Sequence, residues 1–468
     1  MHIEDTPSAG SASGSRQGGQ EMVRAGDSSG TPKRQLTLFD STCIIVGIIL
    51  GASIYESTPS IASNVPSALW LVGIWVIGGV ISLIGAMCYA ELATTYPLAG
   101  GDYVYLTRAF GGRMGFLFAW AQLWVVRPGS VGAMAYVFAR YANEMWPLGR
   151  GAGALMAYAV GSIVVLTLIN IVGAREGKWT QNLLTTVKAL GLVVIVAMGL
   201  IFAVPSASET PAPGSGRVDF RFALILILYA YGGWNEMAYV AAEVREPQRN
   251  ILRSLLLGTL AVTLIYVLAN VAFVHALGLQ GVRNSGAVAA DVLRLGLGQW
   301  GGRIISLLIC LSALGAINGM IFTGARITYA MGTEHRLYAW LGAWNERRGT
   351  PVRSLMIQAV ITLALVIGFG RTQSGFGSLV NFTTPVFWIF FLLVGASLFV
   401  LRVQEPGIMR PYRVPGYPVT PGLFCASSLF MLYASLSYAM ENRSAEGLWA
   451  IGILLVGGML CWMEREGK

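Results

Sequence analysis

The chain has 468 residues, of which 55% are hydrophobic and only 12% are charged. Soluble globular proteins carry about 25% charged residues, so this composition excludes a soluble fold. Glycine accounts for 58 residues, and transmembrane helices tolerate glycine better than soluble helices do. We therefore expect a polytopic membrane protein.

The net charge of +9 comes from 32 basic and 23 acidic residues. A basic excess can indicate a nucleic-acid-binding protein, but here the basic residues concentrate in short segments between apolar stretches. Lys and Arg beside spans set the orientation of membrane proteins. The charge therefore predicts topology, and we expect no nucleic-acid partner.

Residues 1–34 are rich in Gly, Ser, Gln and charge, with almost no large apolar side chain. Such a segment cannot bury enough surface to offset its chain entropy, so we predict a disordered cytoplasmic tail over 1–34. It lacks the apolar core of a secretory signal peptide. The first span is therefore expected to direct the chain into the membrane.

From Leu36 onward, twelve segments suit a hydrocarbon core about 30 Å thick, which takes about 20 helical residues. This pattern predicts an all-α integral membrane fold with a ten-helix core over 35–402. Two further helices and a short C-terminus follow over 403–468. The predicted spans are 38–62, 69–95, 115–145, 152–173, 181–203, 220–245, 251–277, 301–330, 354–369, 376–402, 419–439 and 446–463.

The basic residues divide unevenly between the two sides of these spans. With a cytoplasmic N-terminus, 21 of them lie inside and 8 outside. This bias predicts that both termini are cytoplasmic and that the protein lies in the cell membrane, plasma or inner.

Two predicted spans are interrupted by small residues. The first carries Gly51-Ala52-Ser53, and the sixth carries Gly232-Gly233 followed by Trp234-Asn235. The separation of five spans predicts two inverted five-helix repeats, each led by a broken helix. Breaks at mid-membrane depth are tolerated where their unpaired backbone groups line a cavity or meet a ligand. The alternative is that the glycines only permit close helix packing.

Several chemistries are not supported by the sequence. No GxxxxGK[ST] loop is present, so an ATP-driven pump is disfavoured. The three histidines form no metal-binding motif and no Ser/His/Asp set has catalytic spacing, so we expect neither an enzyme nor a cofactor or metal. Five cysteines lie in apolar stretches as packing residues: Cys43, Cys88, Cys310, Cys425 and Cys461.

Short strings in order along the spans give the chain a family resemblance from about residue 35 to 465. It resembles the amino acid–polyamine–organocation transporters, and most narrowly their L-type amino-acid transporter branch. The strings are Gly51-Ala52-Ser53-Ile54-Tyr55, Tyr89-Ala90-Glu91-Leu92, Arg127-Pro128-Gly129-Ser130, Tyr231-Gly232-Gly233-Trp234-Asn235, Asn318-Gly319 and Arg410-Pro411-Tyr412-Arg413-Val414-Pro415-Gly416-Tyr417-Pro418.

This resemblance implies twelve helices with broken helices 1 and 6 and alternating access around a central site. It also implies sodium-independent exchange of neutral amino acids. Mammalian L-type members are joined to a heavy subunit through a cysteine between spans three and four. Residues 142–152 contain no cysteine, so we expect no disulfide-linked heavy subunit.

An amino acid presents a carboxylate and an ammonium, and two half-helix ends can meet both. The N–H groups at the start of the second half-helix should bind the carboxylate. Carbonyls at the ends of the first halves should accept from the ammonium. The predicted donors are Ala52, Ser53 and Ile54, and the predicted acceptors are Ile49, Tyr229, Ala230 and Gly232.

Two of these positions depart from the family pattern. Ser53 stands where the family usually has glycine, and its Cβ restricts positive φ, although its hydroxyl offers a direct contact to the carboxylate. Tyr229 stands where the branch commonly has a gating Phe. It can cover the ligand or simply pack among other aromatic residues.

Three further residues each have two interpretations. Trp234 is either a wall of the side-chain pocket or a packing residue. Asn235 either orders the break and touches the ligand or caps a helix. Asn318 should face the bundle interior, because an amide facing lipid is unfavourable; whether it touches substrate is open.

Ionisable residues within spans are functional candidates. Lys188 matches a family lysine whose ammonium replaces sodium by binding carbonyls near the first break; the alternative is snorkelling toward the cytoplasm. Glu56 is either a vestibule carboxylate selecting cationic side chains, a partner for Arg127, or solvent-exposed. Glu91 is expected to pair with loop arginines such as Arg108.

We expect a sodium-independent amino-acid transporter that exchanges neutral L-amino acids across the lipid bilayer. One alternative is a proton-coupled carrier, or a carrier of cationic amino acids or polyamines that uses Glu56. An alternative of another class is a nutrient receptor that does not transport.

Overall fold

The computed structural model describes residues 32–51, 53–149, 151–202, 220–369, 375–441 and 445–463. The predicted tail over 1–34 lies almost wholly outside these ranges. Ala52 lies outside them too, and the side chain of Glu56 is not described.

The first predicted span is a broken helix. It consists of α2 (Leu38–Ile49) and α3 (Ser53–Ser63), which are bent by 41° relative to each other. A capping box fixes the start of α2, because Thr37 and Asp40 bond each other's backbone N–H groups. The helix therefore begins at a defined residue, and it ends at Ile49, just before the small residues that the sequence singled out.

The sixth predicted span is interrupted in the same way. Helix α10 (Phe220–Ala230) is followed by turns over 231–235 and then by α11 (Glu236–Tyr239) and η2 (Ala241–Glu243). A short parallel bridge between Leu36 and Val244 joins this region to the chain just before α2.

The remaining predicted spans each hold one helix or a run of consecutive helices. The third is a run of α6 (Gly112–Ala121), η1 (Gln122–Val126) and α7 (Arg127–Met145). The others are α4 (Ala68–Thr95), α8 (Ala152–Val172), α9 (Ala174–Ile201), α12 (Pro247–Asn284), α14 (Trp300–Glu334), α15 (Val352–Phe369), α16 (Gly375–Gln404), α17 (Val419–Glu441) and α18 (Ala445–Met463).

Length and hydropathy support an integral membrane protein. Within the described ranges, eight helices are long and apolar enough to cross a membrane, and the bent pair α2–α3 makes a ninth candidate. The shorter apolar stretches in α10 and α18 fall below that length. A helical membrane fold is therefore confirmed, while the count of twelve spans and the inverted repeat stay predictions.

Some elements were not expected from the apolar pattern. Two short helices, α5 (Asp102–Phe110) and α13 (Val288–Leu297), and the 3₁₀ segment η3 (Arg336–Gly342) lie between spans. The segment η1 is π-helical, and such segments are frequent at functional sites.

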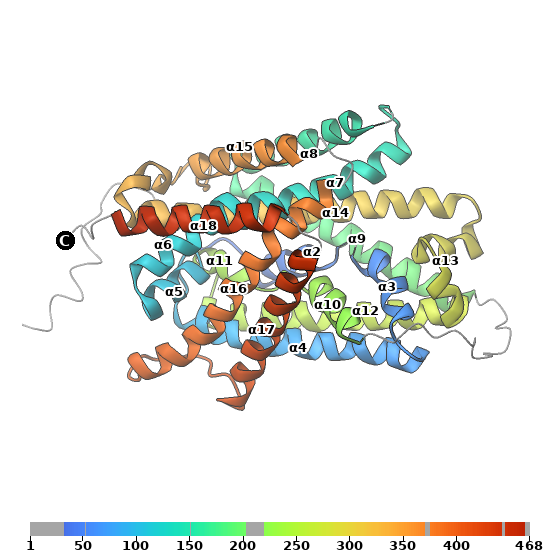
Figure 1. The fold of residues 1–468 in the computed structure, drawn as a ribbon, viewed down its shortest axis with the longest axis horizontal. Helices are drawn as coiled ribbons and strands as arrows, with labels where there is room; N and C mark the ends of the chain where they lie inside the picture. Colours follow the sequence, from blue (N-terminus) through green and yellow to red (C-terminus); the bar gives the residue numbers. More distant parts are fainter. Residues whose placement is uncertain are drawn as a thin grey trace, which may run out of the picture.

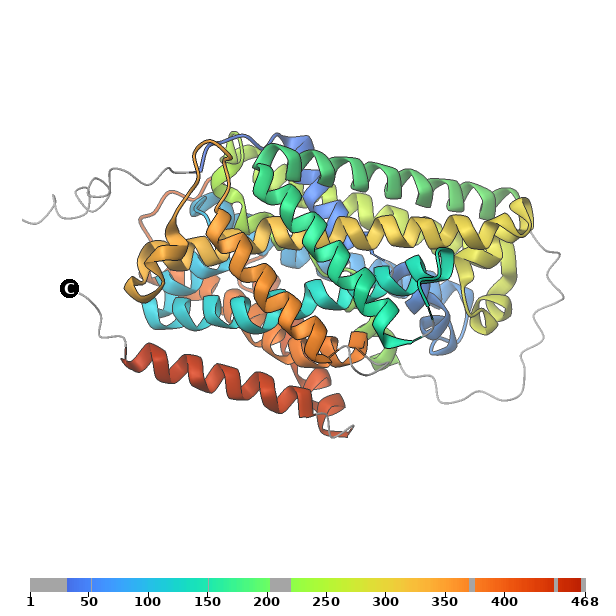
Figure 2. The same ribbon diagram turned by 90° about the horizontal axis from the view of Figure 1, so that it is seen from above.

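The broken helices lie inside the bundle. Helix α2 packs against α9, α12 and α14, and α11 packs against α2 and α14. Helices α4 and α12 run side by side along one edge of the view in Figure 1. Helix α18 runs along the outside of the bundle in Figure 2, where it contacts α16 and α6. The scaffold thus surrounds both breaks.

Candidate functional site

The end of α2 is held by side chains from three other helices. The carbonyl of Ile49 accepts from the Tyr266 hydroxyl at 2.7 Å and from the N–H of Gly51 at 2.6 Å. The Leu50 carbonyl accepts from Ser312 Oγ at 2.7 Å. The terminal carbonyls of a helix have no partner within the helix, so these bonds let α2 end in the protein interior.

Lys188 of α9 is the third side chain that holds the end of α2. Its side chain comes from α9 and is buried, and its Nζ donates to the carbonyl of Gly47, two residues before the end of α2. The snorkelling alternative is wrong, because the ammonium turns inward rather than toward the membrane surface. The lysine carries its positive charge to the negative end of the α2 dipole.

The break in the sixth span packs directly on α2. Gly233 has a φ of 118°, and a Cβ at this position would lie 2.7 Å from Cγ2 of Ile48. The residue must therefore be glycine both for its backbone conformation and for the close approach. The carbonyl of Ala230 lies 3.4 Å from the Tyr266 hydroxyl, so one side chain bridges the two breaks.

Two of the predicted donors, Ser53 and Ile54, lie at the start of α3. Ser53 is its first residue and Ile54 is buried. The first N–H groups of a helix have no partner within it and favour an anion.

Trp234 and Asn235 are both buried beyond the break. The Trp234 ring contacts the rings of Tyr89 and Phe391, with centroids 5.1 and 5.3 Å away. Asn235 makes no capping bond to α11, so the helix-capping interpretation is wrong; its Nδ2 donates to the Tyr239 hydroxyl at 3.1 Å.

A cavity of about 30 Å³ lies beside the second break, lined by Gly232, Trp234 and aromatic residues of α16 and α17. This space suits about one water molecule and is too small for an amino acid. Tyr229, by contrast, keeps 39% of its surface exposed on α10.

Arg127 pairs with an acidic residue that the sequence reasoning missed. Its Nη1 lies 2.7 Å from Glu236 Oε2, and both side chains are almost fully buried. Thr323 Oγ1 donates to the same carboxylate oxygen at 2.5 Å, and Gln122 accepts from Arg127 Nε at 3.1 Å. The ion pair joins α7 to α11, the short helix that follows the second break. The predicted pairing of Arg127 with Glu56 lies outside the described side chains.

Asn318 is completely buried in α14, as expected. Its Oδ1 accepts from Asn170 at 2.8 Å, and its Nδ2 donates to the Gly177 carbonyl and to Gln181 at 3.1 and 3.0 Å. Both polar atoms of the amide are thus used in joining α14 to α8 and α9.

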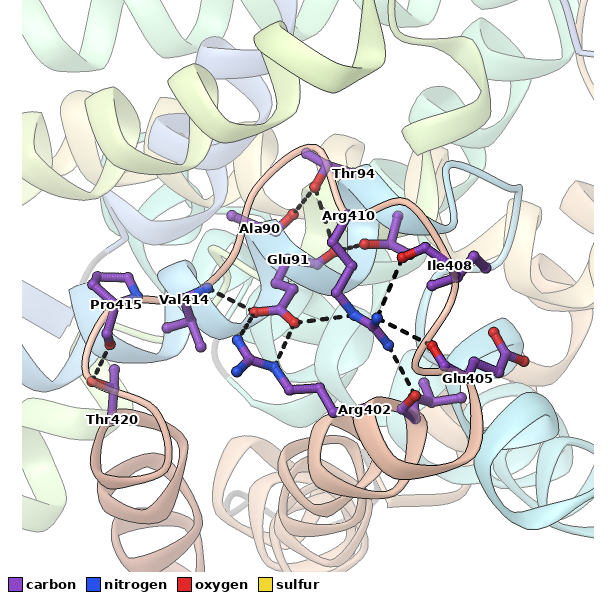
Figure 3. Close-up of polar contacts among 12 residues, drawn as sticks. Ala90, Glu91, Thr94, Arg402, Glu405, Ile408, Arg410, Val414, Pro415 and Thr420 are labelled. Atoms are coloured by element: carbon purple, nitrogen blue, oxygen red, sulfur yellow. Dashed lines mark hydrogen bonds and ion pairs between the residues drawn. The ribbon is translucent and has the colours of Figure 1, made fainter.

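Glu91 binds arginines at the end of α4, although not the one named from the sequence. Figure 3 shows Arg402 and Arg410 converging on its carboxylate. Arg402 donates at 2.8 and 2.6 Å, and the N–H of Val414 donates at 2.7 Å. Arg108 instead pairs with Glu405 at 3.3 Å. Glu91 therefore anchors the 405–418 loop.

Tyr266, Ser312 and Glu236 are the site residues that sequence reasoning missed. Tyrosine and serine are common in apolar helices, so their spacing carried no signal. Glu236 could have been found, because an acidic residue three positions after Gly233 requires a partner within the membrane. In the described part of the chain, no cluster of three His, Cys, Asp or Glu side chains could hold a metal ion.

A helical membrane bundle with two broken spans in contact is the architecture of many membrane transporters. A family model described as "Amino acid permease" matches residues 36–459. The chain therefore belongs to the amino acid permease family, and it is a multi-pass membrane protein rather than an enzyme.

Curated relatives agree with this assignment. The human "Large neutral amino acids transporter small subunit 2" is 31% identical over 420 residues, covering 86% of this chain and 76% of the relative. The mouse "b(0,+)-type amino acid transporter 1" is 29% identical over 436 residues, covering 91% and 86%. The "Cystine/glutamate transporter" of Pongo abelii is 29% identical over 426 residues, covering 89% and 82%.

Proposed function

We propose that the protein is a sodium-independent exchanger of neutral L-amino acids that works by alternating access. Twelve spans, two inverted repeats and cytoplasmic termini in the cell membrane belong to this proposal. The observation that carries it is the meeting of the two breaks, where Tyr266 reaches the carbonyls of Ile49 and Ala230. A donor group of the ligand can take the place of that hydroxyl.

In this proposal the amino acid binds mainly to backbone groups. Its carboxylate meets the N–H groups at the start of α3, at Ala52, Ser53 and Ile54, because that end of the helix is positive. Its ammonium meets the carbonyls of the first half-helices. The acceptors are those of Ile49, Tyr229, Ala230 and Gly232, with Gly51, Gly233, Trp234 and Asn235 shaping the break.

Lys188 supports the absence of sodium from the mechanism. Its ammonium already donates to the Gly47 carbonyl, and carbonyls at helix ends are also the groups that coordinate sodium in carriers with broken helices. A fixed cation at this position holds α2 without an ion. Arg127, Glu56 and Asn318 remain candidates for selectivity around this centre.

No disulfide-linked heavy subunit is proposed, although a relative is named a small subunit. The free cysteines of the described residues are Cys43, Cys88, Cys310, Cys425 and Cys461, and four of the five are buried. A bond to a second chain requires an accessible sulfur in the outer loop, and residues 142–152 supply none.

The test is transport by the purified protein in liposomes, with labelled neutral, cationic and acidic amino acids and with polyamines. Uptake should require a neutral amino acid inside the vesicles and should be unchanged when potassium replaces sodium. Uptake into empty vesicles driven by a pH gradient would contradict exchange and favour a proton-coupled carrier. Absence of transport with every substrate, despite measurable binding, would favour a receptor.

A further inference from the structure

Five acidic side chains are buried in the described part of the chain, and one of them differs from the rest. Four have a basic partner. These ion pairs are Asp40 with Lys178 at 3.2 Å, Glu91 with Arg402 at 2.6 Å, Glu236 with Arg127 at 2.7 Å and Glu243 with Arg326 at 2.7 Å. Within the same residues, no Lys, Arg or His forms an ion pair with the fifth, Asp102.

Asp102 is the first residue of α5, a short helix between spans, and its side chain is 2% exposed. Its Oδ2 accepts from the hydroxyls of Tyr89 at 2.9 Å and Tyr239 at 2.7 Å. Its Oδ1 has no partner among the described atoms. Burying a carboxylate without a counter-charge is costly, and such a group takes up a proton instead.

The charges around Asp102 do not supply the missing partner. Arg127 acts electrostatically on Asp102, but it lies over the Tyr239 ring at 4.8 Å and pairs with Glu236. The titratable and charged groups that face Asp102 are Tyr89 of α4, Tyr105 of α5, Arg127 of α7, and Glu236 and Tyr239 of α11. Elsewhere on α5, Tyr103 bonds Glu334 of α14, and Arg108 bonds Glu405 beyond the end of α16.

Burial raises the pKa of Asp102 to about 7, although the two tyrosine hydroxyls and Arg127 oppose that rise. A carboxyl group with this pKa gains and loses a proton under ordinary cellular conditions. The unpaired Oδ1 can carry the proton while Oδ2 keeps both tyrosine contacts.

We propose that Asp102 is a proton-binding site that controls how firmly the half-helix after the second break is held against α4 and α5. The contacts that it joins come from α4 through Tyr89 and from α11 through Tyr239. The backbone reinforces this connection, because the N–H of Gly100 donates to the Tyr239 carbonyl at 3.2 Å. The ligand is a proton from water at the end of the bundle that carries α5. It forms an O–H bond on the Asp102 carboxylate, and no other covalent bond is made or broken in the protein.

The direction of the pH effect follows from linkage. When the α5–α11 contact opens, Asp102 becomes hydrated and its pKa falls toward about 3.9, the value of a free aspartate. A group whose pKa is higher in the closed conformation stabilises that conformation at low pH, and the effect is lost as pH rises through about 7. Opening should therefore become about tenfold easier between about pH 6 and about pH 8.

The first test, the rate of amino-acid exchange, rests on the proposed transport function. The second test, proton binding by Asp102, does not. Exchange of a labelled neutral amino acid would be followed in vesicles with equal pH on both sides, so that insertion in either orientation gives the same result. Wild-type exchange should rise by up to about tenfold from about pH 6 to about pH 8. Asp102→Asn, which is neutral throughout, should give a flat profile.

Infrared spectroscopy of the purified protein tests the proton directly, without any transport. A band of a protonated carboxylic acid should be present at acidic pH, be lost as pH rises through about 7, and be missing in Asp102→Asn. Tyr89→Phe removes a donor that favours the charged form, so the midpoint should move to higher pH. Tyr105→Phe is the matched control, because its buried hydroxyl has no partner, and it should behave as the wild type.

Two results would overturn the proposal. One is a wild-type pH profile of exchange in Asp102→Asn, and the other is an infrared titration with no band that depends on Asp102. If no amino acid is exchanged at all, the proposed transport function fails, while the infrared titration still decides whether Asp102 binds the proton. If Asp102→Asn does not fold, the midpoint shift in Tyr89→Phe decides the same question.

Discussion

The Tyr266 hydroxyl donates to the Ile49 carbonyl at 2.7 Å, so a side chain of α12 closes the end of the first half-helix. The same hydroxyl lies 3.4 Å from the Ala230 carbonyl at the end of α10. Tyr266 is completely buried and its ring packs against those of Trp75 and Tyr231. The two breaks are therefore joined by a side chain held firmly in place.

We predict that Tyr266→Phe lowers the exchange rate by about five- to fifteenfold, because one buried hydrogen bond contributes about 1–1.5 kcal/mol. The ring packing would be kept, so the protein should still fold. Exchange in liposomes and thermal unfolding in detergent measure the two effects separately. Tyr105→Phe serves as the control, since it removes a buried hydroxyl that bonds nothing among the described residues. Equal activity of Tyr266→Phe and this control would show that the bridge does not matter.

Lys188 offers a test of the sodium-independent mechanism. Lys188→Ala leaves the Gly47 carbonyl without its donor and removes a positive charge from the end of α2, so we predict that exchange falls by at least about tenfold. Arg175→Ala is the matched control on the same helix, because it also removes a positive charge, but from an exposed side chain. Normal transport by Lys188→Ala would show that the lysine only fills space.

The two glycine breaks should respond differently to alanine. At Gly233 a Cβ would meet Ile48 at 2.7 Å and φ is 118°, whereas at Gly51 the nearest atom, the Ile49 carbonyl oxygen, is 3.6 Å away. We predict that Gly233→Ala lowers the unfolding temperature and abolishes exchange, because both strain and overlap must be relieved. Gly51→Ala should keep the wild-type unfolding temperature. Similar behaviour of the two variants would contradict this account of the second break.

The apolar pattern predicted where the helices lie, because hydrocarbon length and hydropathy act along the sequence alone. The flexible residues also located both breaks. The contact partners of individual side chains could not be predicted from the sequence in the same way. Arg127 and Glu236 are 109 positions apart, and Tyr266 and Ile49 are 217 positions apart. The same holds for Glu91, for which the sequence predicted an arginine partner but not which one. Its partners are Arg402 and Arg410, because the 405–418 loop folds back onto the end of α4.

Arg127 and Glu236 form an ion pair that joins α7 to α11, the helix that follows the second break. Its N–O distance is 2.7 Å and both side chains are more than nine-tenths buried. Removing one partner of such a pair leaves an uncompensated charge in a low-dielectric interior, which costs about 3–5 kcal/mol, whereas replacing both by apolar residues is often nearly neutral.

We therefore predict that Arg127→Met and Glu236→Met each unfold at a lower temperature than the wild type, and that the double variant recovers most of the loss. Thermal unfolding of the four proteins in detergent gives the coupling between the two residues. The recovered double variant then separates folding from function, because it keeps the packing but lacks the charges. If it exchanges amino acids normally, the pair serves stability alone. If it is stable but inactive, the charges act in the movement of α11 against α7. Additive losses in the double variant would contradict the pairing itself.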